Sequence, residues 1–80
     1  MLHKYNNTRL MILATVLKDR PDIQWHYNKR TLIAQVETKR GYILVGERYK
    51  NIEVQLDSAS STLYLPATAE GMRQALKYVA

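Results

Sequence analysis

Basic side chains occur in three short groups about ten residues apart in the middle of the chain. The groups are Asn28-Lys29-Arg30, Lys39-Arg40-Gly41 and Arg48-Tyr49-Lys50. Guanidinium and ammonium groups donate charge-assisted hydrogen bonds to phosphate and carboxylate oxygens. The tyrosine between two cations in the third group adds a ring on which a nucleic-acid base can stack. These residue types therefore indicate the binding of an anion.

Residues able to carry out catalysis or hold a metal are few. The chain has no cysteine, and no helical or loop spacing pairs His3 with His26 as metal ligands. The serines of residues 58–61 lie in an expected turn with no general base within reach in sequence. The three glycines are scattered, so they do not form a glycine-rich phosphate loop. We therefore expect no enzymatic activity, no metal and no cofactor.

Two aromatic residues precede the first basic group and allow two interpretations. In the first, Trp25 and Tyr27 share a strand face and belong to the core, while Lys29 and Arg30 form a solvated turn. In the second, the rings and cations form one edge that stacks bases and binds phosphates. The first interpretation is the simpler. Tyr49 has no evident packing task, so a functional and a structural interpretation both remain open for it.

Residues 8–19 are predicted to form a helix. Any of residues 6–8 can cap its start, and Pro21 stops it because the residue before proline avoids the α region. Seven of the eight residues from 10 to 17 are apolar, which is more than one buried stripe needs. The helix is therefore either covered on two sides within the fold, which is the plainer interpretation, or it takes part in a homodimer.

Five segments with strand-like patterns follow, at residues 23–28, 32–37, 42–45, 52–57 and 63–65. Most alternate apolar and polar residues with a period of two. The third is apolar on both faces, so we expect it to be central. The breaks between the segments are short, and short breaks favour an antiparallel meander.

A second helix is predicted over residues 68–79, after Pro66 ends the last strand. Thr68 is suited to cap it. The chain thus predicts an α+β fold of the form α-βββββ-α. In this fold a meander of about five antiparallel strands is flanked by an N-terminal and a C-terminal helix packed on one face. We expect residues 1–80 to form one compact domain.

The predicted topology sorts the charges between the two ends of the sheet. The chain has a formal net charge of +5. A meander places the turns at 28–30 and 48–50 at the same end, together with the starts of both helices. We call this the far end, and its expected basic residues are Lys4, Arg9, Lys29, Arg30, Arg48 and Lys50. The turn at 39–41 falls at the opposite, near end, among the carboxylates of Asp19, Asp22, Glu37 and Asp57.

The open face of the sheet argues against one mode of nucleic-acid binding. The positions assigned to it include Gln24, His26, Gln35, Glu37, Glu53 and Asp57. Carboxylates repel a phosphate backbone. A nucleic acid is therefore expected at the far end and not across the sheet.

The N-terminal apolar run does not predict a targeting or membrane segment. Residues 10–17 follow two basic residues, as in a secretory signal, but the charged residues 18–22 stand where a cleavage site is required. The run is also much shorter than a transmembrane helix. We expect a cytoplasmic protein without membrane association.

These patterns indicate a small binding protein. The leading hypothesis is a basic nucleic-acid-binding accessory or regulatory protein that contacts phosphates through Arg9, Lys29, Arg30, Arg48 and Lys50, with Tyr49 available for stacking. The alternative is a protein-binding inhibitor or adaptor whose partner presents an acidic surface. A phage or another mobile element could encode such a protein to occupy a host factor.

Overall fold

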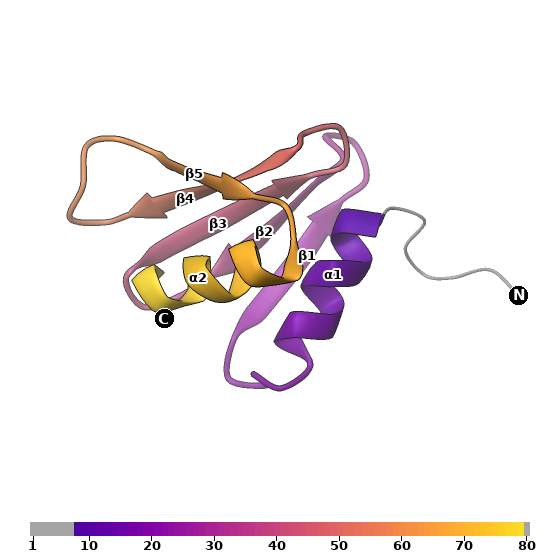
Figure 1. The fold of residues 1–80 in the computed structure, drawn as a ribbon, viewed down its shortest axis with the longest axis horizontal. Helices are drawn as coiled ribbons and strands as arrows, with labels where there is room; N and C mark the ends of the chain where they lie inside the picture. The colour runs from indigo at the N-terminus through magenta and orange to yellow at the C-terminus, as the bar shows by residue number, and fades with distance from the viewer. Residues whose placement is uncertain (1–7, 80) are drawn as a thin grey trace, which may run out of the picture.

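The sheet and helices follow the predicted order. A computed structural model describes residues 8–79 (Figure 1). The elements in chain order are α1 (Thr8–Leu17), β1 (Gln24–Asn28), β2 (Ile33–Glu37), β3 (Gly41–Gly46), β4 (Asn51–Leu56), β5 (Leu63–Pro66) and α2 (Ala69–Val79). The predicted α+β class is confirmed.

The five strands form one antiparallel sheet in the order β1-β2-β3-β4-β5. The register sets Trp25 opposite Val36 and Ile43 opposite Val54. β3 is central, as its apolar residues on both faces predicted. A meander of this kind returns the chain to the same end of the sheet after every second strand, which fixes where the turns lie.

Both helices cover one face of the sheet (Figure 1). α1 packs against α2 and β3, while α2 packs against β4 and β5. The fully buried side chains come from all these layers, and the largest are Leu10, Leu13, Ile43, Ile52, Met72, Val36, Val45, Val54 and Val79. Trp25 and Tyr27 are half-buried and pack against this core, which confirms their structural interpretation.

Burial within the fold accounts for most of the apolar surface of α1. Leu10, Leu13 and Leu17 are buried, and Val16 joins them because α2 and β3 cover adjacent sides of the helix. Met11 remains 44% exposed. None of the helices within residues 8–79 is both long and apolar enough to cross a membrane.

The helix ends depend on local hydrogen bonds. α1 ends two residues earlier than predicted, where the Arg20 N–H donates to the Leu17 carbonyl at 3.0 Å. The predicted caps at Asn6 and Asn7 lie outside the described residues. At the start of α2, the Thr68 hydroxyl accepts a hydrogen bond from the Gly71 N–H at 3.0 Å, so the predicted cap is confirmed.

Three residues lie differently from their predicted positions. Leu32 belongs to the β1–β2 turn and not to β2, and its φ of 60° is in the left-handed region. Gly41 is the first residue of β3 and not part of the turn. It is required there because a Cβ would meet the Gln55 carbonyl oxygen. Asp57 follows the end of β4 and therefore does not lie on the open face.

Candidate functional site

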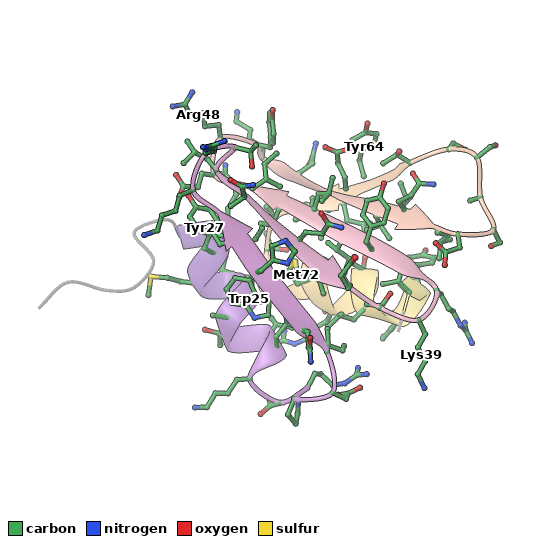
Figure 2. The ribbon with its side chains drawn as sticks, turned by 180° about the vertical axis from the view of Figure 1, so that it is seen from behind. Trp25, Tyr27, Lys39, Arg48, Tyr64 and Met72 are labelled. Atoms are coloured by element: carbon green, nitrogen blue, oxygen red, sulfur yellow. The ribbon has the colours of Figure 1, made fainter. Side chains whose placement is uncertain are left out.

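The two outer basic turns meet at the far end of the sheet. The Glu47 N–H donates to the Leu32 carbonyl at 3.0 Å, which ties the β3–β4 turn directly to the β1–β2 turn. The third basic group lies elsewhere. Figure 2 shows Arg48 and Lys39 at opposite ends of the sheet. As predicted, two of the basic groups therefore lie together at one end of the sheet, and the third lies at the other end.

Contacts from three other segments hold the β3–β4 turn in place. An Arg9 guanidinium nitrogen, Nη1, donates to the Glu47 carbonyl at 2.6 Å, and the Tyr27 hydroxyl donates to Glu47 Oε1 at 2.5 Å. The Ala67 N–H donates to the Lys50 carbonyl at 3.0 Å, which joins the start of α2 to the same turn. Arg9 thus lies at the far end as predicted, with a structural contact of its own. Lys4 lies outside the described residues.

The β1–β2 turn is shaped by Asn28. Its side-chain oxygen accepts hydrogen bonds from the Arg30 N–H at 2.8 Å and the Thr31 N–H at 3.3 Å. Asparagine commonly organises turns in this way. The Leu32 N–H closes the turn on the Asn28 carbonyl at 2.8 Å. Lys29 and Arg30 are consequently displayed at the tip, and both are exposed.

A hollow of about 220 Å³ lies between the two turns. Its lining residues are Arg30, Thr31, Leu32, Glu47, Arg48 and Tyr49. Within residues 8–79, no carboxylate lies at ion-pairing distance from Lys29, Arg30, Arg48 or Lys50. The charges of these four exposed side chains are therefore available to an external anion.

Tyr49 has a packing role that the sequence did not reveal. Its ring lies against the backbone of Gly46, since a Cβ built at Gly46 would fall 2.3 Å from Tyr49 Cδ2. The residue is nevertheless 55% exposed. The ring is thus covered on the side of Gly46, and its remaining surface is open to solvent, where a base can stack on it. The structural and functional interpretations of Tyr49 are therefore compatible.

The near end has mixed charges. Lys39 shares a hollow of about 380 Å³ with Arg20, Asp22 and Glu37. Arg20 forms an ion pair with Asp22 at 3.2 Å. The pKa of the Asp22 carboxyl is lowered mainly by its hydrogen bond from Arg20, and the charge of Lys39 adds to this effect. A further hollow sets Asp57 beside Lys39 and Arg40. The basic residues of this end therefore face carboxylates, as predicted.

A larger hollow, of about 470 Å³, also lies toward the near end, between α1 and α2. Its charged lining residues are Asp19, Arg20, Arg73 and Lys77. Its charges are mixed, because Asp19 adds a carboxylate and Arg20 is already paired with Asp22. Size alone therefore does not identify the functional surface.

The open face carries apolar and aromatic side chains beside the polar residues assigned to it. The register places His26, Gln35, Leu44, Glu53 and Tyr64 in one row across the five strands. The neighbouring row includes Tyr42. Tyr64 is 60% exposed. The alternation of Tyr64 with Leu63 and Leu65 was the signal that would have placed this tyrosine on the open face.

No metal-binding cluster is found in the described part of the chain, where no three or more His, Asp or Glu side chains come together. Comparisons with protein-family models, with curated protein sequences and with solved structures gave no match to this chain. The fold and the site thus define an α+β sheet protein with a basic far end, and its function has to be inferred from that end.

Proposed function

We propose that this is a non-enzymatic nucleic-acid-binding accessory or regulatory protein that contacts phosphates through the far end. The observation that carries this proposal is the hydrogen bond between the Glu47 N–H and the Leu32 carbonyl. It brings Arg30 and Arg48 to the rim of one hollow, with Lys29 and Lys50 on the same two turns.

The chemistry of the four cations suits a chain of phosphate groups. Each guanidinium can donate two parallel hydrogen bonds to a phosphate group. A row of cations on a polyanion also releases condensed counterions, which supplies most of the affinity in non-specific binding. Contacts of this kind position the nucleic acid without reading its sequence. The expected activity is therefore binding with weak sequence preference.

A salt titration tests the proposal. If about four phosphates of a duplex are neutralised, affinity falls roughly a hundredfold between 50 and 200 mM salt. The measurement is fluorescence anisotropy of a labelled oligonucleotide with the full chain. An affinity that does not change across this range would overturn the proposal.

The open face favours a second candidate, a protein-binding inhibitor or adaptor. Tyr42 and Leu44 are half-buried on it and Tyr64 is exposed, and tyrosine is enriched in protein interfaces. The far end would then match an acidic surface on the partner. Affinity capture from nuclease-treated lysate distinguishes the candidates. A stoichiometric protein that remains bound after nuclease treatment supports the second candidate, and loss of all bound material supports the first.

A further inference from the structure

A second hollow adjoins the far end, on the open face of the sheet. It measures about 390 Å³ and is lined by Tyr49, Lys50, Asn51, Glu53 and Tyr64. It shares Tyr49 with the hollow between the basic turns, so both hollows adjoin this residue. The surface therefore places aromatic rings directly beside the cations already assigned to phosphate binding.

The two rings reach the hollow from different elements. Tyr49 comes from the β3–β4 turn and folds back onto Gly46. Tyr64 comes from the edge strand β5, directly opposite Glu53 on β4, and it lies on the face turned away from the helices (Figure 2). They are 55% and 60% exposed, respectively. The exposed part of each ring faces the hollow and is accessible to a ligand.

We propose that this hollow takes an unpaired base of a single-stranded nucleic acid, which stacks on Tyr49 and Tyr64. The phosphates of the strand then follow Lys50 and Arg48 at the rim. This inference rests on the proposed function and specifies its ligand. Bases in a duplex are already stacked on each other, whereas unpaired bases present a free face to an aromatic side chain.

Glu53 determines which part of the bound nucleotide faces the hollow. A carboxylate at the lining of the hollow repels phosphates, so the backbone is kept at the basic rim. The same carboxylate accepts a hydrogen bond from the amino group of a base such as cytosine. The acidic open face therefore excludes phosphates without excluding bases. The base lies at the far-end edge of the open face, and the phosphate backbone does not cross the sheet.

Exposed tyrosines permit a direct test with a matched control. Tyr64→Ala and Tyr49→Ala are each expected to weaken binding of a labelled single-stranded oligonucleotide about fivefold or more, because one stacking contact is lost. Tyr64→Phe keeps the ring and is expected to retain affinity. The control is Tyr78→Ala, because Tyr78 is 48% exposed and also lies beside two cations, Lys39 and Arg40, but at the near end.

Gly46→Ala gives a second variant that leaves every charge and every tyrosine in place. No glycine in the described residues has a positive φ, so the backbone accepts alanine. The three atoms nearest to the added Cβ all belong to the Tyr49 ring, which must move. We expect this variant to lose single-strand affinity as Tyr49→Ala does. Circular dichroism of each variant establishes that the fold is retained.

The outcomes separate this inference from the proposed function. The stacking site is overturned if the tyrosine variants bind single strands as tightly as the wild type does. If Arg48→Ala with Lys50→Ala still weakens binding in that case, phosphate binding at the far end stands. A tighter affinity for duplex than for single strand of equal length also overturns it. Absence of salt-dependent binding to either form overturns both.

Discussion

The hydroxyl of Tyr27 donates a hydrogen bond of 2.5 Å to the carboxylate of Glu47, twenty residues away in sequence. This contact joins the end of β1 to the turn that carries Arg48. The Glu47 carbonyl also accepts a hydrogen bond from Arg9. The acidic residue at the centre of the basic end is therefore used to hold the turn, and the cations around it are left facing outward.

Removal of the Tyr27 hydroxyl tests whether its hydrogen bond to Glu47 stabilises the fold, and the effect should depend on pH. The pKa of Tyr27 is raised above its ordinary value of 10.0, first by the hydrogen bond to Glu47 and then by desolvation and by the charge of the carboxylate. The folded state therefore holds the proton more tightly than the unfolded state. The stabilisation is fully present below about pH 10 and is lost as the pH rises through the raised pKa.

Tyr27→Phe is accordingly expected to be less stable than the wild type at neutral pH, and the difference should shrink at alkaline pH. The measurement is the midpoint of urea unfolding for both proteins over a pH series. Tyr64→Phe removes an exposed hydroxyl outside this contact and serves as the control. A difference between wild type and Tyr27→Phe that stays constant through the alkaline range would contradict the assignment.

The start of α2 depends on its cap. Thr68→Ala removes the hydroxyl that accepts from the Gly71 N–H and is expected to cost about 1 kcal/mol, within a range of roughly 0.5–2 kcal/mol. Thr15→Ala is the matched control, because the Thr15 hydroxyl bonds to the Met11 carbonyl inside α1. Alanine is the better helix former there, so this change should be neutral or stabilising. Equal losses in urea unfolding would refute the capping role.

The close approach of β3 and β4 explains why residue 41 is a glycine. A Cβ at this position would lie 1.9 Å from the Gln55 carbonyl oxygen, a backbone atom that moves only with β4. Gly41→Ala is therefore expected to destabilise the fold by about 1–3 kcal/mol. Gly46→Ala should cost much less, because its obstacle is the exposed ring of Tyr49. Thermal unfolding of both variants checks the order, and a larger loss for Gly46→Ala would contradict it.

Pattern and topology made the fold predictable from sequence. Alternation placed Trp25 on the core face, double-sided apolarity made β3 central, and the even number of strands between them set the two basic turns at one end. These features depend on periodicity and on chain direction, both of which a sequence contains. The α+β class and the location of Lys39 away from Arg48 followed from them.

Other features of the site depend on contacts that no local pattern records. The support of the Tyr49 ring requires a glycine three residues earlier and a turn that folds back on it. The left-handed φ of Leu32 is imposed by closure of the turn on Asn28, since leucine has no preference for it. The role of Glu47 arises from Tyr27 and Arg9, which are distant in sequence.

The most direct test of phosphate binding at the far end compares two double variants of equal net charge. Arg48→Ala with Lys50→Ala removes two far-end cations, and Lys39→Ala with Arg40→Ala removes two at the near end. Oligonucleotide affinity is measured for each over a salt series. The far-end variant should bind more weakly, and the slope of its log affinity against log salt concentration should fall by about two in magnitude. The near-end variant should stay close to the wild type. Equal weakening by both variants would show that only net charge matters and would contradict a defined site at the far end.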